Sequence, residues 1–255
     1  MNTNPAARSD ESPLRGFDRV LAFLREQIFA GALRPGDRLM PERELSLQLG
    51  VSRPVVREAL RALAMIGAVE ILHGVGTIVR RPDASVLGEF FAFALVHRAD
   101  MIDDVMQARI AIECQAIRLA CERAGIADIE RLQRALQRIH STIDDPEAGA
   151  AADYDFHGAL VRAAQSDTLL CLHQAMAEPL RRCHRERRDL IRRHGEIKEY
   201  VAQDHARIFD AVLAREPQAA EDVLRRHFAI GDEFRRRAAL AAARPLAEHG
   251  SGTDG

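Results

Sequence analysis

The chain has 255 residues, of which 47% are hydrophobic but only 5% aromatic, and it contains no tryptophan. This length supports one large or two modest domains, and the composition favours helices over a strand-rich sandwich. A formal net charge of −2 excludes a strongly basic surface over the whole protein. Lys198 is the only lysine, so nearly every positively charged side chain in this protein is an arginine. An arginine therefore cannot be assigned a function from its residue type alone.

Cysteine spacing and hydropathy exclude other protein classes. The four cysteines lack any CxxC spacing and fall within helical patterns, which disfavours a disulfide scaffold or a cysteine-type zinc site. No apolar run approaches the roughly 18 residues of a membrane span, and the first residues lack a signal-peptide pattern. We therefore expect a cytoplasmic protein that makes no membrane contact.

The charge is divided between two regions. Residues 14–82 contain 11 arginines against 7 acidic residues, a net of +4, whereas residues 83–243 contain 23 basic and 27 acidic residues, a net of −4. A positive excess on a small N-terminal unit is typical of a domain that contacts phosphates. We expect domains over 13–82 and 83–243, with disordered polar tails outside them, at 1–12 and 244–255.

Three helices are predicted in the N-terminal region. Apolar spacing from Val20 to Phe29 indicates the first helix, which the turn residues of Gly31–Gly36 end. A second helix starts at Pro41 and ends at Gly50, a suitable C-cap, and a third runs from the N-cap candidate Ser52 to Gly67. Only a short turn separates the second helix from the third.

A small hairpin follows these helices. Two β-rich runs, Val69–Leu72 and Thr77–Val79, are joined by the sequence His-Gly-Val-Gly. Three helices with a tight turn and a glycine-tipped hairpin predict a winged helix-turn-helix, in which the third helix reads DNA. Its first turn presents Ser52, Arg53 and Arg57, and the two arginines share a face that can reach guanine edges or phosphates. The alternative is that both arginines are solvated helix charges.

A family resemblance rests on this region. The segment LRPGDRLMPERELSLQLGVSRPVVREALRALAMIGAVEILHGVGTIV resembles the N-terminal domain of GntR-family transcriptional regulators. The resemblance implies binding to double-stranded DNA at a two-fold-symmetric operator by a homodimer. The DNA-contacting positions that it implies are Arg43, Arg53, Arg57, His73 and Gly74.

The C-terminal region is predicted to be an all-α bundle, so the fold class is mainly α: a winged helix-turn-helix followed by about seven helices. The predicted helices are separated by breaks at Gly125, Pro146, Ser166-Asp167, Gly195 and Pro217. These helices span 85–97, 102–124, 127–143, 148–165, 168–193, 196–214 and 218–242.

Histidines lie on the apolar faces of the last two predicted helices. His205 shares a face with Ile208 and Val212, and His227 lies on a similar face of the last helix. Each histidine is 11 residues from Glu216 in the connecting turn. In an antiparallel hairpin the two would sit side by side, about 16 Å from that turn.

An earlier helix adds Asp153 and His157, which lie four residues apart on one face. Burying a carboxylate beside three imidazoles is costly unless a cation or hydrogen bonds compensate. A divalent metal would do so, and three nitrogens with one oxygen suit Zn(II), with Ni(II), Co(II) or Mn(II) left open. A single such histidine is better interpreted as a hydrogen-bonded core residue, and the other histidines, His173 and His184 included, lack a comparable set.

A second resemblance covers the C-terminal region. With its DYDFHGAL segment and later histidines, this region resembles the FCD ligand-binding domain of the FadR-like branch of the GntR family. The resemblance implies that Asp153, His157, His205 and His227 hold a metal at the base of an effector pocket. The branch member that binds acyl-CoA lacks this arrangement, which disfavours a fatty acyl effector.

Arg109 shares an apolar stripe with Val105 and Ile112, so we expect it to point inward. It could form an internal ion pair with Glu113, four residues on, or clamp a carboxylate whose other end binds the metal. The resemblance favours the carboxylate clamp. The arginine-rich run 181–188 is interpreted as a solvated helix face.

These observations predict a homodimeric, metal-containing transcriptional regulator and not an enzyme. We expect a repressor that a small organic acid releases from DNA. Two alternatives remain open: a regulator for which the ion itself is the signal, and, less favoured, a metalloenzyme that uses the Asp/His site. The inward-facing residues include no obvious extra general base, and an enzyme would leave the N-terminal domain unexplained.

Overall fold

The computed structural model shows a mainly α-helical chain, as predicted, with two strands and eleven helices in the described part. The residues it describes are 13–84, 86–95, 101–193 and 197–243. They form two compact units, of which the first ends at Val86 and the second starts at Leu87. The tails predicted to be disordered lie outside the described residues.

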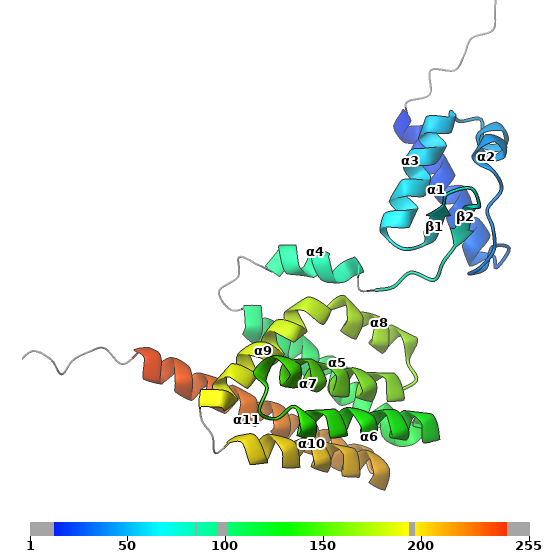
Figure 1. The fold of residues 1–255 in the computed structure, drawn as a ribbon. Coiled ribbons are helices and arrows are strands. Elements are labelled where there is room, and N and C mark those ends of the chain that lie inside the picture. Colours follow the sequence, from blue (N-terminus) through cyan, green and yellow to red (C-terminus); the bar gives the residue numbers. More distant parts are fainter. Residues whose placement is uncertain (1–12, 85, 96–100, 194–196, 244–255) are drawn as a thin grey trace, which may run out of the picture. The chain divides into compact units, whose positions relative to one another are not determined.

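The first unit contains three helices and an antiparallel hairpin (Figure 1). Their bounds are α1 Pro13–Phe29, α2 Glu42–Leu49, α3 Arg53–Met65, β1 Val69–Leu72 and β2 Gly76–Val79. Val20, Leu24, Leu45, Val56 and Leu60 are buried in one apolar core that joins the three helices. The predicted winged helix-turn-helix arrangement is therefore confirmed.

Local backbone geometry explains where these elements turn. Gly50 ends α2 in the left-handed conformation, with φ 63°, which confirms the predicted C-cap. Ser52 occupies the N-cap position of α3, but its side chain makes no capping hydrogen bond. Gly74 has φ +74° in the turn between the strands, and a Cβ added there would meet nothing within 4 Å. The hairpin tip is thus compact and open around Gly74.

The second unit is a helical bundle (Figure 1). Its helices are α4 Val86–Leu95, α5 Met101–Arg123, α6 Ile126–Ser141, α7 Pro146–Ala163, α8 Asp167–Ala175, α9 Ala177–Arg193, α10 Ile197–Ala214 and α11 Pro217–Ala243. The predicted breaks at Gly125, Pro146 and Pro217 are confirmed. Asp145 caps α7, since its side chain accepts hydrogen bonds from the amides of Glu147 and Ala148.

One predicted helix was wrong. The expected continuous helix over 168–193 is divided at Met176 into α8 and α9, which gives eight helices in the described part of this unit instead of about seven. The cause lies in the sequence, because Pro179 has no N–H to donate to the Ala175 carbonyl and its ring would clash with that turn. The division gives α9 an orientation independent of α8.

Helix α7 is central in the bundle and packs against α5, α6 and α9. Its buried Phe156 and Leu160 join Ile117 of α5, Leu132 of α6 and Phe228 of α11 in the main apolar core. Helices α10 and α11 pack against each other and against α5. Polar residues on the buried face of α7 therefore lie in the interior of the bundle.

Candidate functional site

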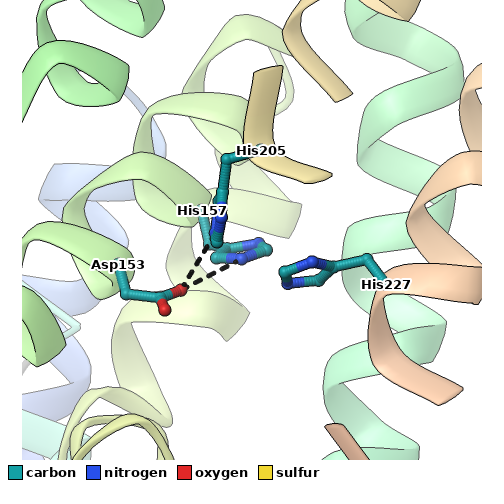
Figure 2. Close-up of side chains that lie close together, drawn as sticks. All are labelled: Asp153, His157, His205 and His227. Carbon is teal, nitrogen blue, oxygen red and sulfur yellow. Dashed lines mark hydrogen bonds and ion pairs between the residues drawn. The ribbon is translucent and has the colours of Figure 1, made fainter. Parts of the chain in front are cut away.

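Four polar side chains meet inside the bundle. Asp153 and His157 come from α7, His205 from α10 and His227 from α11, and all four are fully buried. Each offers one ligand atom, and these atoms lie within 4.8 Å of one another. Figure 2 shows the carboxylate and the three imidazoles turned toward a common point. The structure thus brings together the four residues on which the sequence prediction of a metal site rests.

The two contacts of Asp153 Oδ1 within the cluster have the spacing of ligands around a tetrahedral cation. Asp153 Oδ1 lies 3.4 Å from His157 Nε2 and 3.3 Å from His205 Nε2. Ligands about 2.0–2.1 Å from a tetrahedral Zn(II) are roughly 3.3 Å from each other. His157 Nε2 and Asp153 Oδ2 are buried without hydrogen-bond partners. The donor set therefore fits a divalent metal ion by its chemistry, and the two distances from Asp153 Oδ1 fit tetrahedral coordination.

Two of the imidazoles are held from behind by carboxylates. His157 Nδ1 lies 2.6 Å from Glu113 Oε2, and His227 Nδ1 lies 2.7 Å from Asp204 Oδ2. A neutral histidine that donates its Nδ1 proton in this way keeps the Nε2 lone pair free. This carboxylate–histidine pairing is typical of metal-binding histidines in proteins.

Glu113 also connects Arg109 to the cluster. Arg109 Nε donates to Glu113 Oε1 over 2.8 Å, so the internal ion pair considered from the sequence is present. The guanidinium also lies over the Phe228 ring, 4.7 Å from its centroid, while Nη2 has no hydrogen-bond partner. Burial opposes ionisation of Glu113, but Arg109 and His157 outweigh it and hold the pKa of Glu113 well below its usual value.

Sequence reasoning missed three buried polar residues near the cluster. His184 Nδ1 of α9 lies 3.1 Å from Asp153 Oδ1, and Arg188 Nε lies 3.5 Å from Asp153 Oδ2. His173 of α8 stacks on Tyr154 and has Nε2 3.6 Å from Glu113 Oε1. Histidines set aside in the sequence prediction are thus part of the same polar network.

The interpretation of residues 181–188 as a solvated face was wrong for His184 and Arg188, although Arg181 and Arg182 are exposed. The missed signal was the spacing of Leu180, His184 and Arg188, which places all three on one side of α9. The high arginine content of the segment concealed this stripe.

Burial and nearby charges together set the pKa values of His184 and Asp153. Burial is the largest influence on His184 and, with the nearby charge of Arg109, lowers its pKa to about 3, which leaves the imidazole neutral at pH 7. Burial favours the neutral form of Asp153, but contacts with His184 and His205 outweigh it and keep the pKa of this carboxyl well below its usual value. An ionised Asp153 is the form of this carboxyl that a metal requires.

The residues predicted to contact DNA are on the surface of the first unit. Arg43 of α2 and Arg53 and Arg57 of α3 are exposed. Ser52, His73 and Gly74, at the start of α3 and the hairpin tip, are exposed too. Arg57 Nε donates to Glu42 Oε2 over 2.7 Å, which links the two helices of the helix-turn-helix at its surface.

Comparison with known proteins gives the family. Residues 17–79 match the bacterial regulatory proteins of the gntR family, and residues 104–230 match the FCD domain. The chain belongs to the GntR family. The resemblance seen in the sequence is thereby confirmed for both domains, and the FCD domain fits the FadR-like branch.

Relatives of this GntR-family chain are transcriptional regulators. It is 33% identical over 199 residues to the HTH-type transcriptional regulator LutR of Bacillus subtilis, covering 77% of this chain and 90% of LutR. It is 34% identical over 196 residues to the HTH-type transcriptional repressor NanR of Citrobacter rodentium, covering 75% and 74% of the two chains. The NanR of Escherichia coli K12 is 31% identical over 231 residues, covering 89% and 85%.

A solved structure supports the fold. The structure titled Streptococcus agalactiae GntR aligns with a TM-score of 0.63 at 21% identity, covering 85% of this chain and 99% of the other. The family match and the named relatives, in contrast, show that this GntR-family chain is a DNA-binding transcriptional regulator and not an enzyme. Within the described ranges, no helix has both the length and the apolar character needed to cross a membrane.

Proposed function

We propose that this regulator is a homodimeric repressor that a small organic acid releases from its operator. The acid binds a divalent metal ion, best suited to Zn(II), held by Asp153, His157, His205 and His227. The observation that carries the proposal is the convergence of these four buried side chains, whose ligand atoms lie within 4.8 Å of one another. The relatives named as repressors support the direction of control.

A metal accounts for the polarity of this interior. Asp153 is ionised and fully buried, and its Oδ2 lacks a hydrogen-bond partner. Arg188 Nε, 3.5 Å from this oxygen, is too far for a good hydrogen bond, so a cation bound to the carboxylate would further offset the cost of burying its charge. Zn(II) can expand from four ligands to five, which would leave a position for one oxygen atom of an organic acid. Arg109, with its unpartnered Nη2, offers such an acid a further hydrogen bond.

The first unit supplies the DNA contacts in this proposal. Arg53 and Arg57 are exposed at the start of α3, where a recognition helix meets base edges in the major groove. Arg43 and Ser52 would contact phosphates, which fix the register of the protein on the duplex. His73 and Gly74 at the hairpin tip would approach the minor groove. Two copies related by a two-fold axis would read a two-fold-symmetric operator.

Release requires that the acid bind better to the arrangement of the dimer that does not fit the operator. By linkage, DNA and acid must then weaken each other's binding by the same factor. Typical couplings between such sites are about 1–3 kcal/mol, or roughly 5–150-fold in affinity. In this proposal the acid lowers DNA affinity by favouring one arrangement of the dimer. It does not need to contact DNA itself.

The test is operator binding by the metal-loaded homodimer. An operator selected from random duplexes would be titrated in the presence of hydroxy, keto and sugar acids, with metal content measured by elemental analysis. We expect at least one acid to reduce operator affinity about tenfold or more. If the whole panel leaves affinity unchanged, release by an acid is wrong. If a chelator alone abolishes DNA binding reversibly while no acid has an effect, the ion is the signal.

A further inference from the structure

The hairpin of the first unit carries no lysine or arginine of its own. Residues 69–79 contain neither residue type, and the one acid among them, Glu70, accepts a hydrogen bond from Arg80 Nε over 2.7 Å. DNA presents about one negative charge per 1.7 Å of its axis to a hairpin that approaches it. A permanent positive charge beside the hairpin tip therefore has to come from another segment of the chain.

The segment just before α2 lies alongside β2. The Leu39 amide donates to the Thr77 carbonyl over 2.8 Å, and Arg38 forms an antiparallel bridge with Ile78. This segment is therefore paired with β2 in the manner of a short third strand. Successive side chains of such a strand point to opposite faces. Leu39 is buried in the core, and Arg38 is exposed.

The Arg38 guanidinium lies against the bare backbone of Gly76. A Cβ added to Gly76 would be 3.0 Å from Nε and 3.3 Å from Nη2 of Arg38, so the guanidinium takes the space that a side chain would need. The bridge to Ile78 makes Gly76 a diagonal neighbour of Arg38 on the same face. The cation is thus placed at the first residue of β2, two residues after Gly74.

No acidic side chain neutralises Arg38. Within the part of the chain that the structure describes, its side chain forms no hydrogen bond or ion pair. Arg57 and Arg80, in contrast, each pair with a glutamate. The adjacent Asp37 accepts a hydrogen bond from the backbone amide of Arg34 over 2.7 Å. The charge of Arg38 is therefore available to an anion from outside the chain.

The position of Arg38 along the hairpin favours a phosphate over a base edge. At about 3.3 Å per residue, Gly76 lies roughly 7 Å behind Gly74 at the tip. The minor groove is about 6 Å wide and 7.5 Å deep, so it admits only the tip of a hairpin. A side chain roughly 7 Å behind that tip faces the phosphates that border the groove.

We propose that Arg38 contacts a DNA phosphate at the edge of the minor groove and supplies the positive charge that the hairpin lacks. This inference rests on the proposed function, because it assumes that the hairpin tip approaches the minor groove. It adds a contact from outside both the helix-turn-helix and the hairpin. A phosphate contact carries no sequence information, so Arg38 strengthens binding to the operator and to random DNA alike.

The test is the salt dependence of DNA binding, measured by fluorescence anisotropy with the selected operator and with random duplexes. Each phosphate contact steepens the slope of log affinity against log salt by about 0.9. We expect Arg38→Gln to make this slope about 0.9 shallower per bound copy, and to weaken binding to both kinds of DNA about five- to tenfold. Arg25→Gln is the matched control, because Arg25 is exposed on α1, and it should keep the parent slope.

The outcomes separate a phosphate contact from a structural role. A parent-like slope in Arg38→Gln would overturn the inference even if affinity falls, because a distorted hairpin also lowers affinity. Arg38→Lys keeps the charge and should retain the parent slope. A slope as shallow in Arg38→Lys as in Arg38→Gln would show that packing matters and charge does not, and a loss confined to the operator would show a base contact. Either result would overturn the inference.

The substitution Arg57→Ala distinguishes this inference from the proposed function. If Arg57→Ala weakens operator binding while Arg38→Gln leaves the slope unchanged, the proposed DNA face stands and only the role of Arg38 is wrong. Parent-like binding by both variants would overturn the proposed DNA face together with this inference.

Discussion

His227 and Asp204 form a short buried hydrogen bond, with His227 Nδ1 2.7 Å from Asp204 Oδ2. This contact holds the ring with its Nδ1 edge toward Asp204, so that Nε2 is the nitrogen on the side of the cluster. Glu113 does the same for His157. Two of the four proposed ligands are thus oriented by residues that would not touch the ion.

Replacing Asp204 by Asn should weaken metal binding without removing a ligand. An amide cannot provide the negative charge that fixes the histidine tautomer, so we expect metal affinity to fall about 10–100-fold. Competition with a fluorescent chelator measures this change. Asp210→Asn is the matched control, since Asp210 is exposed on the same helix. Equal affinities for the two variants would exclude an orienting role for Asp204.

The substitution His205→Ala removes a proposed ligand directly. We expect purified protein to carry substantially less than one ion per chain, because one of the four donors is absent. Elemental analysis gives the ratio, and circular dichroism shows whether the bundle is folded. His140→Ala, at an exposed position on α6, should retain the metal of the parent. Full occupancy in folded His205→Ala would remove His205 from the ligand set.

Metal removal should destabilise the bundle. An ion bound only by the native state, at about 1,000 times its dissociation constant, contributes roughly 4 kcal/mol to the free energy of unfolding. For a domain of 150–250 residues this corresponds to a melting temperature about 8–16 °C higher. Calorimetry before and after dialysis against a chelator tests the shift, which added Zn(II) should restore. An unchanged melting temperature would argue against a metal in the core.

Arg57→Ala should weaken operator binding and leave metal content unchanged. Loss of one arginine contact to a base costs about 1–3 kcal/mol, or roughly 5–150-fold in affinity. Fluorescence anisotropy with the selected operator measures this loss. Arg134→Ala, at an exposed position on α6, is the control for a simple decrease in positive charge. Parent-like affinity would mean that the recognition helix is misassigned.

Glu42→Gln should raise the affinity for DNA in general but lower the preference for the operator over random DNA. The carboxylate of Glu42 holds Arg57 in place over 2.7 Å, and it also repels DNA phosphates. Without this charge, binding to random duplexes should strengthen because the repulsion is lost. Discrimination of the operator from random DNA should fall because Arg57 is no longer oriented. The ratio of the two affinities at fixed salt is the measurement, and an unchanged ratio would rule out positioning by Glu42.

Much of this architecture could be predicted from local sequence signals. Apolar spacing, together with glycines at turns such as Gly50 and Gly74, predicted the helix-turn-helix and its hairpin. Helical spacing alone placed Asp153 and His157 on one face, and the equal distances of His205 and His227 from their turn placed those two side by side. Their rings lie 4.6 Å apart between centroids.

The remaining contacts depend on tertiary packing. Glu113 pairs with Arg109 as the local spacing allowed, but its contact with His157, 44 residues away, has no local signal. His184 and Arg188 were missed because the surrounding arginines made α9 resemble a surface helix. The division of α8 from α9 did have a local signal, Pro179, which the predicted helix over 168–193 did not take into account.

The division at Met176 has a consequence for how binding specificity can change in such a bundle. Consecutive residues of an α-helix point about 100° apart, so one residue added or deleted between α8 and α9 would rotate every side chain of α9 by that angle. Arg185 or another neighbour would then take the inward position of His184, while α7 and its proposed ligands stayed in place. The number of residues between α8 and α9 thus sets the rotation of α9 about its own axis. That rotation decides which side chains of α9 point toward α7.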